Sequence, residues 1–119
     1  MKSYRDLIVW QKAMALVKEI YSLITVFPKA ETYALSDQLK RAAVSVPSNI
    51  AEGYGRQSTK DYIHFLNIAR GSVYEVDTQL RIAIMLEYLT PEEAQKAFGL
   101  VEEVGKMLNS ISAKLMPDA

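Results

Sequence analysis

Residues 58–89 read STKDYIHFLNIARGSVYEVDTQLRIAIMLEYL, and this stretch holds one glycine and no proline. Its apolar residues recur every three or four positions, which is the period of one face of an α-helix. Ser58 followed by Asp61 resembles a capping box and marks the start of the helix. The pattern predicts one helix over residues 58–89, with a core stripe made of Tyr62, Phe65, Leu66, Ala69, Val73, Val76, Leu80, Ala83 and Ile84.

The segment before Pro28 predicts an earlier helix over residues 6–27, with Asp6 as its N-cap. The expected core stripe of this helix contains Trp10, Ala13, Met14, Val17, Ile20, Tyr21 and Ile24. A second row beside that stripe contains Val9, Leu16 and Leu23. This row is apolar surface beyond the expected core face.

A polar link over residues 29–32 leads to a second helix, whose apolar face contains Leu35, Leu39, Ala42, Ala43, Val46 and Ile50. Pro47 lies inside this helix, where its ring and its missing N–H predict a kink. Ser45 and Ser48 flank Pro47 and offer hydroxyl groups to the freed backbone groups. The helix is expected to end at Gly53 or Gly55.

The fourth helix has a complete start signal, with a cap at Thr90, Pro91 at the first position, and Glu92 and Glu93 in the first turn. It is expected to end before Pro117, and its apolar face contains Ala94, Ala97, Val101, Val104, Leu108, Ile111 and Leu115. Four amphipathic helices joined by short links predict an all-α, antiparallel up-down-up-down four-helix bundle that forms one domain over residues 1–119.

The composition excludes several classes of function. The 119 residues include 14 Lys+Arg, 14 Asp+Glu, one His and no Cys. Without cysteine there is no disulfide framework, no thiolate nucleophile and no Cys-based metal site. Zero net charge excludes strong steering of the whole molecule toward nucleic acid or an anionic membrane. No apolar stretch is long enough to span a bilayer, so we expect a small soluble cytoplasmic domain.

No constellation of residues supports catalysis or metal binding. His64 is the only histidine, and its position away from the core stripe predicts a solvated side chain. Gly53-Tyr54-Gly55 lacks both the preceding strand and the Gly-Lys-Ser of a phosphate-binding loop. We therefore expect no enzymatic activity, no cofactor and no metal.

The 58–89 helix carries more apolar surface than a bundle core needs. At about 100° per residue, a second face lies far from its core stripe; the members of this face are Ile63, Gly71, Tyr74, Thr78, Ile82 and Met85. A helix that is apolar nearly all round is normally buried all round. This face and the Val9, Leu16 and Leu23 row predict self-association into a homo-oligomer. The alternative is scattered apolar residues, as found on any protein surface.

Two polar clusters lie at the margins of the core stripes on the second and third helices. One cluster contains Ser48, Asn49 and Glu52, and the other contains Arg70, Gly71, Ser72 and Glu75. A partly buried arginine needs a carboxylate, so we expect Arg70 to pair with Glu52 and lock the two helices together. Replacing either residue with alanine would then cost about 3 kcal/mol. The alternative is a ligand or partner site built from the same groups.

Basic residues are unevenly distributed although the total charge is zero. Residues 1–74 hold ten Lys+Arg and six Asp+Glu, whereas the remainder holds four and eight. Lys40, Arg41, Arg56 and Lys60 are expected to gather around one end of the second and third helices and to form a candidate contact for the RNA or DNA backbone. The alternative is a solvated helix surface.

Three segments carry a family resemblance: YRDLIVWQKA at residues 4–13, VPSNIAEG at 46–53, and ARGS at 69–72 with Glu75. They resemble the bacterial four-helix-bundle family of 23S rRNA intervening-sequence proteins, also labelled ribosomal-protein-like, over about residues 4–115. The resemblance implies a bundle that assembles as a ring, a pentamer, without enzymatic activity. It also implies kinship with accessory proteins of diversity-generating retroelements, which bind nucleic acid and are more basic than this chain.

We therefore expect a non-enzymatic homo-oligomeric scaffold with candidate contacts to RNA or DNA. The alternative is a protein-interaction adaptor with no nucleic-acid role, and neither function involves a membrane. Salt dependence separates the two, because binding through phosphate contacts weakens steeply as salt rises.

Overall fold

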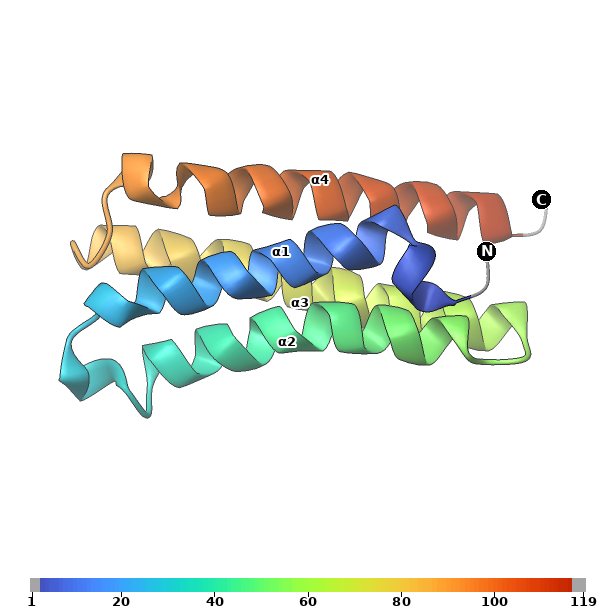
Figure 1. Ribbon diagram of the computed structural model, residues 1–119, viewed down its shortest axis with the longest axis horizontal. Coiled ribbons are helices and arrows are strands. Elements are labelled where there is room, and N and C mark those ends of the chain that lie inside the picture. Colours follow the sequence, from blue (N-terminus) through green and yellow to red (C-terminus); the bar gives the residue numbers. More distant parts are fainter. Residues whose placement is uncertain (1–2, 117–119) are drawn as a thin grey trace.

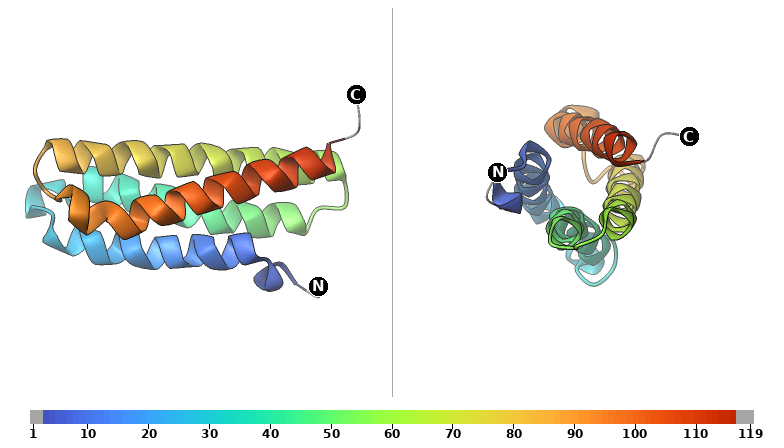
Figure 2. Two further views of the ribbon diagram at one scale, coloured as in Figure 1. Left: turned by 90° about the horizontal axis from the view of Figure 1, so that it is seen from above. Right: turned by 90° about the vertical axis from the view of Figure 1, so that its right-hand side faces the viewer.

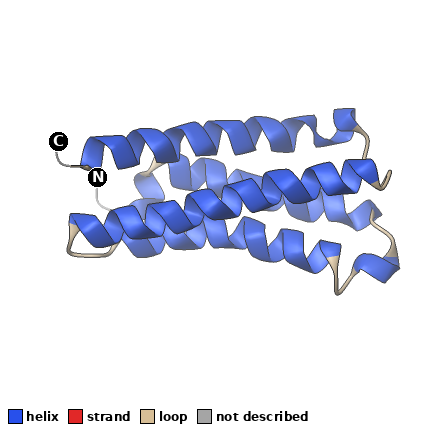
Figure 3. Cartoon of the chain, turned by 180° about the vertical axis from the view of Figure 1, so that it is seen from behind, coloured by secondary structure: helices blue, strands red, loops and turns tan. Residues whose placement is uncertain are grey.

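Four long helices run antiparallel along a bundle of 46 × 23 × 21 Å in the computed structural model, which describes residues 3–116 (Figure 1). They are α1 (Ile8–Leu23), α2 (Leu35–Tyr54), α3 (Thr59–Met85) and α4 (Pro91–Leu115). Short 3-10 turns lie before α1 (Tyr4–Asp6), after it (Ile24–Val26) and before α2 (Lys29–Glu31). Residues 3–116 contain helices and loops only (Figure 3), so the all-α prediction is confirmed.

Each helix packs against two neighbours in the order of the chain, and α4 closes the bundle against α1 (Figure 2). The α1–α2 and α3–α4 connections lie at one end of the bundle. The α2–α3 turn lies at the other end, together with the start of α1 and the end of α4. This is the up-down-up-down connectivity that short links favour.

The core of α1 differs from the prediction. Its buried side chains are Val9, Ala13, Leu16 and Ile20, whereas Met14 and Tyr21 are each 44% exposed. Two of the three residues in the expected outer row are therefore core residues. The apolar arc of α1 is wider than the buried face, and tertiary packing selects which part of that arc turns inward.

The core face of α2 is the predicted one, and all six expected residues are buried. The helix continues through Pro47, which is itself buried, and ends at Tyr54 with Gly55 as its C-cap. Gly53 is buried where α2 and α3 approach most closely. A Cβ built on Gly53 would lie 2.8 Å from Phe65 Cβ, so the close approach requires glycine at this position.

The predicted starts of α3 and α4 are confirmed. Ser58 Oγ accepts a hydrogen bond from the Asp61 N–H at 3.1 Å. Thr90 and Glu93 form a reciprocal capping box, with both hydrogen bonds present. The Asp6 cap is wrong, because Asp6 lies in the 3-10 turn and the residue before α1 is Leu7.

The predicted end of α3 at residue 89 is also wrong. The helix ends at Met85, and Glu87 takes a left-handed conformation with φ 64°. Tyr88 N–H then bonds Ala83 O, and Glu87 N–H bonds Ile84 O, both at 2.9 Å, which is the Schellman pattern of helix termination. Glycine usually occupies this left-handed position. Because Glu87 stands there instead, the sequence carries no signal for the end of the helix.

The α3–α4 turn is tied to the α1–α2 connection by Tyr88. Its hydroxyl donates to Glu31 Oε2 at 2.8 Å, and its ring lies 5.5 Å from that of Phe27. Glu31 Oε1 also accepts from the Leu35 N–H at the start of α2, at 3.2 Å. The hydrogen bond to Glu31 raises the pKa of Tyr88, with smaller contributions from burial and from the Glu31 charge.

Candidate functional site

An apolar groove of about 360 Å³ runs between α1 and α2. Its walls are formed by Tyr4, Trp10, Met14 and Val17 on one side and by Val44, Pro47, Ser48 and Ala51 on the other. Met14 and Val44 are 44% and 41% exposed, so apolar side chains face solvent from both walls. The groove uses the part of the α1 apolar arc that was expected to be core.

Aromatic residues lie at one end of this groove and in a pocket beside it. At one end, the rings of Tyr4 and Trp10 meet edge to face with centroids 5.4 Å apart. Gln11 holds the 3-10 turn of Tyr4 in place by donating to the Arg5 carbonyl oxygen at 3.0 Å. In the neighbouring pocket, which shares Val44 with the groove, Lys40 Nζ lies 5.5 Å from the centre of the exposed Tyr21 ring.

The expected outer face of α3 is only partly exposed. Tyr74 and Met85 are 59% and 71% exposed, and Gly71 and Thr78 are exposed beside them. Ile82 is half-buried against the bundle core, and Ile63 is half-buried next to Leu115. The apolar part of this face therefore consists of Tyr74 and Met85.

Three polar side chains form a seam between α2 and α3. Asn49 Nδ2 donates to the Ser45 carbonyl oxygen at 2.8 Å and to Ser45 Oγ at 2.9 Å. Ser72 Oγ donates to the same Ser45 Oγ at 2.8 Å, and Ser72 is only 4% exposed. The seam therefore fixes the register of the two helices with a satisfied buried network. Of the two expected polar clusters, Asn49 and Ser72 belong to it, and Ser48, Glu52, Arg70 and Glu75 do not.

Glu52 and Arg70 do not pair with each other. Glu52 Oε1 forms an ion pair with Arg56 Nη2 at 2.6 Å, and Arg70 Nη1 donates to Asn109 Oδ1 on α4 at 3.0 Å. Ser72 and Glu75 face α2, whereas Arg70 lies about 200° around α3 from Ser72 and faces α4. The expected lock is wrong because Arg70 lies on the flank of α3 that faces α4, whereas Glu52 lies on α2 and pairs with Arg56.

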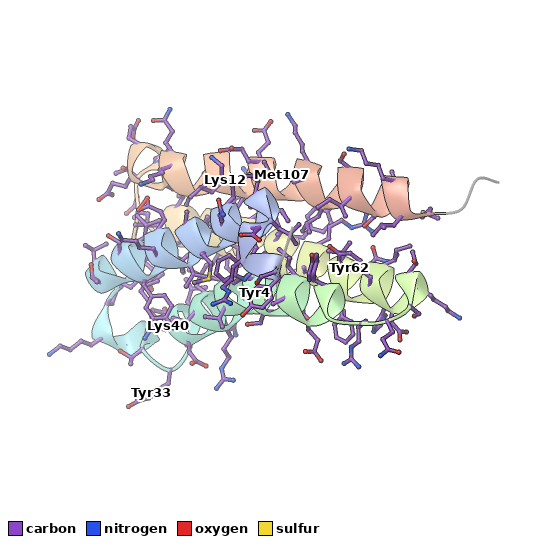
Figure 4. The ribbon with its side chains drawn as sticks, turned by 45° about the vertical axis from the view of Figure 1, so that its right-hand side comes forward. Tyr4, Lys12, Tyr33, Lys40, Tyr62 and Met107 are labelled. Carbon is purple, nitrogen blue, oxygen red and sulfur yellow. The ribbon has the colours of Figure 1, made fainter. Side chains whose placement is uncertain are left out.

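The four expected basic residues do not gather in one patch. Lys40 and Arg41 lie in the N-terminal half of α2, and Arg56 and Lys60 lie at the α2–α3 turn. Fifteen residues separate Arg41 from Arg56, which is roughly 20 Å along a helix. Figure 4 shows Lys40 and Tyr62 well apart along the bundle. Each arginine also has a carboxylate partner four residues earlier, Asp37 for Arg41 and Glu52 for Arg56.

Aromatic side chains occupy the α2–α3 turn. The rings of Tyr54 and Tyr62 meet edge to face at 6.1 Å, and the Arg56 guanidinium lies 4.8 Å from the Phe65 ring centre. Burial raises the pKa of Tyr62, with a smaller contribution from Tyr54. His64 is exposed beside Phe65, as expected.

Within residues 3–116, no group of three or more His, Asp and Glu side chains is arranged to hold a metal ion. None of the helices in this range is long and apolar enough to cross a membrane. The described residues therefore form grooves and polar seams between the helices.

The model of the 23S rRNA-intervening sequence protein family matches residues 5–110. The chain belongs to this family. Its fold is similar to the 1.70 Å crystal structure of a protein of unknown function from the S23 ribosomal protein family of Bacteroides thetaiotaomicron VPI-5482. The TM-score is 0.82 at 29% identity, and the match covers 88% of this chain and 98% of that chain. None of the curated proteins compared with this chain matches it.

The VPSNIAEG motif that carried the family resemblance contributes to three different surfaces. Pro47, Ser48 and Ala51 line the α1/α2 groove. Asn49 joins the α2/α3 seam, and Gly53 permits the close approach of α3. A single helical segment with three partners explains why the motif combines apolar, polar and small residues.

Sequence reasoning missed the groove itself and two hydrogen-bond partners, Ser45 and Asn109. A signal for the groove was available, because Trp10 and Tyr21 are eleven residues apart, which is three helical turns. Large aromatic residues at that spacing mark one line along the surface of α1. Nothing in the sequence marks Asn109, because its role depends on which flank of α3 faces α4.

Proposed function

We propose that the chain is a non-enzymatic scaffold that assembles with copies of itself through the α1/α2 groove. The observation that carries this proposal is the groove lined by Trp10, Met14 and Val17, with Met14 and Val44 more than two-fifths exposed. Contiguous exposed apolar surface of this kind marks interaction sites in soluble proteins. An apolar groove between two helices suits an apolar helix face from a partner.

The complementary face is the exposed part of α3. Tyr74 and Met85 are eleven residues apart, and so are Trp10 in the groove and Tyr21 in the pocket beside it. Both spacings correspond to about 16 Å along a helix. Two large side chains on α3 of one copy therefore match the spacing of Trp10 and Tyr21 on α1 of the next, and the small residues Gly71 and Thr78 beside them permit close approach.

A contact between two different faces is heterologous, so each copy offers one groove and one α3 face. Such contacts close into a ring when the rotation between neighbours permits it. We propose a ring, and the family resemblance favours a pentamer. The oligomer face of this proposal retains Gly71, Tyr74, Thr78 and Met85 and omits the half-buried Ile63 and Ile82.

A protein partner is favoured over nucleic acid by the charges on the surface. Arg41 and Arg56 are each engaged by a carboxylate of the same helix, and Lys40 lies over Tyr21. Within residues 3–116, these three residues therefore form no concentrated basic stripe of the kind that binds phosphate backbones.

Light scattering tests the proposal at micromolar concentration. We expect the wild type to have the mass of a pentamer of the 13.4 kDa protomer. Met14→Glu and Tyr74→Glu each place a charge in the proposed contact and should reduce the mass to that of the protomer. Ile8→Glu is the matched control, because Ile8 is 55% exposed and lies outside the groove. A wild type at protomer mass contradicts the proposal.

A further inference from the structure

A second pocket, of about 310 Å³, lies between α2 and α3 and differs from the apolar groove in chemistry. Ala42 and Ser72 are buried at its base, with 5% and 4% exposure. Its polar lining includes Gln38 and Arg41 from α2 and Glu75 and Gln79 from α3. The volume falls within the range of small-molecule sites.

Gln79 brings an unsatisfied acceptor to this pocket. Its Oε1 atom is buried and has no hydrogen-bond partner, and it is the only such side-chain atom within residues 3–116. Leaving a buried polar atom unpaired costs roughly 1–3 kcal/mol. Nearly all buried polar groups are paired, so an exception indicates a missing partner. Because the unpaired atom is a carbonyl oxygen, that partner must be a hydrogen-bond donor.

The other polar groups also favour a donor with positive charge. Glu75 is exposed at the rim, one helical turn from Gln79, and forms no ion pair among the contacts within residues 3–116. The Ser72 hydroxyl, which donates to Ser45 Oγ, adds an acceptor oxygen nearby. A carboxylate with amide and hydroxyl oxygens is the set that binds ammonium and guanidinium groups.

Arg41 is the one cation in the lining, and its charge is already balanced. Its Nε atom lies 2.8 Å from Asp37 Oδ2 on the same helix. An anionic ligand would have to compete with Asp37 for Arg41, and it would leave Gln79 Oε1 unpaired. The charges around the pocket therefore favour a cation over an anion.

We propose that the α2/α3 pocket binds a primary ammonium or guanidinium group, which donates to Gln79 Oε1 and pairs with the Glu75 carboxylate. Two sources could supply this chemistry: a small diamine or guanidino compound, or a lysine or arginine side chain of another copy of the chain. The pocket is separate from the α1/α2 groove, and binding of a small diamine or guanidino compound there does not depend on the proposed assembly.

Titration of ¹⁵N-labelled protein with agmatine and with putrescine, followed by NMR, tests the proposal. We expect saturable shifts of the Gln79 side-chain amide and of the Ser72 and Glu75 backbone amides. Gln79→Met should weaken binding at least about tenfold, and Glu75→Gln several-fold. Gln95→Met, at an exposed position of α4, is the matched control and should leave the affinity unchanged. The dispersion of each spectrum verifies that each variant is folded.

A dilution series distinguishes the two sources. If a neighbouring copy supplies the group, the Gln79 signals change on dilution and agmatine restores their positions. If a small molecule is the ligand, the signals are unchanged by dilution and respond only to agmatine or putrescine. The proposal is overturned if neither compound shifts these signals up to tens of millimolar, or if inorganic phosphate shifts them instead.

Discussion

Ser72 Oγ donates to Ser45 Oγ across the α2/α3 interface at 2.8 Å, and the same oxygen accepts from Asn49 at 2.9 Å. This contact joins two helices at positions that are 27 residues apart in the chain. It places Gln38 opposite Gln79 two turns away, because antiparallel helices that meet at Ser45 and Ser72 keep that register along their length. The seam therefore positions the polar pocket as well as the interface.

Removing the buried hydroxyl of Ser72 should destabilise the bundle. We expect Ser72→Ala to lower the free energy of unfolding by about 1 kcal/mol, because a hydrogen bond between neutral groups is lost in a buried position. Ser48→Ala is the control, since Ser48 is exposed on the other flank of α2. Urea unfolding followed by circular dichroism measures both. Equal free energies of unfolding for the two variants would show that the hydrogen bond of Ser72 adds nothing to the stability of the bundle.

Glu52 and Arg70 should behave as independent surface residues. Glu52→Ala and Arg70→Ala are each expected to cost about 1 kcal/mol or less, because Glu52 is 55% exposed in an ion pair with Arg56. A double-mutant cycle should give a coupling energy near zero. These costs replace the value of about 3 kcal/mol expected if Glu52 and Arg70 formed a buried pair. A large coupling energy would contradict them and support the buried pair.

Gly53 and Gly99 should respond oppositely to alanine although both lie inside helices. Gly53→Ala should destabilise by about 1–3 kcal/mol, because the new Cβ would overlap Phe65 Cβ at 2.8 Å. Gly99→Ala should stabilise by about 0.5–1 kcal/mol, because nothing lies within 4 Å of its Cβ position and alanine favours the helix. Thermal unfolding of the two variants measures the difference. Stabilisation by Gly53→Ala would contradict the close approach of α2 and α3.

The raised pKa of Tyr88 predicts that the folded protein loses stability in alkaline solution. Its pKa is raised in the folded protein, first by the hydrogen bond to Glu31, so the protonated phenol is favoured by folding. This contribution is complete below the unfolded pKa of about 10 and is lost as the pH rises through the folded value. Tyr88→Phe should therefore show a shallower decline of melting temperature between about pH 9 and pH 11. Tyr33→Phe is the control, at 95% exposure. Parallel declines for wild type and Tyr88→Phe would contradict this assignment.

The parts of the fold that were predictable are those marked by local signals. Thr90, Pro91 and Glu93 specify the start of α4 within one turn of chain, and the structure contains both hydrogen bonds of the capping box. The end of α3 was not predictable in this way. Glu87 occupies the left-handed position that glycine usually marks, and the turn is supported by the distant contact of Tyr88 with Glu31.

The candidate site depended on rotations and registers that one sequence does not determine. Both apolar rows of α1 were visible, but only packing against α2 and α4 decides that Leu16 is buried and Met14 exposed. Likewise, the polar residues of α2 and α3 were recognised, but their pairing depends on which flank of α3 each one occupies. Arg70 faces α4 and Ser72 faces α2, two residues away along the chain.

Cysteine cross-linking tests the groove-to-face assembly most directly, because the chain has no native cysteine. The variant with both Met14→Cys and Tyr74→Cys offers one thiol in the groove and one on the α3 face of every copy. Under mild oxidation we expect a ladder of covalent oligomers from this double variant, dimers from a mixture of the two single variants, and no product from either single variant alone. A control that pairs Met14→Cys with Lys96→Cys on α4 should give no ladder. Dimers from Tyr74→Cys alone, or no cross-link from the double variant, would contradict the account.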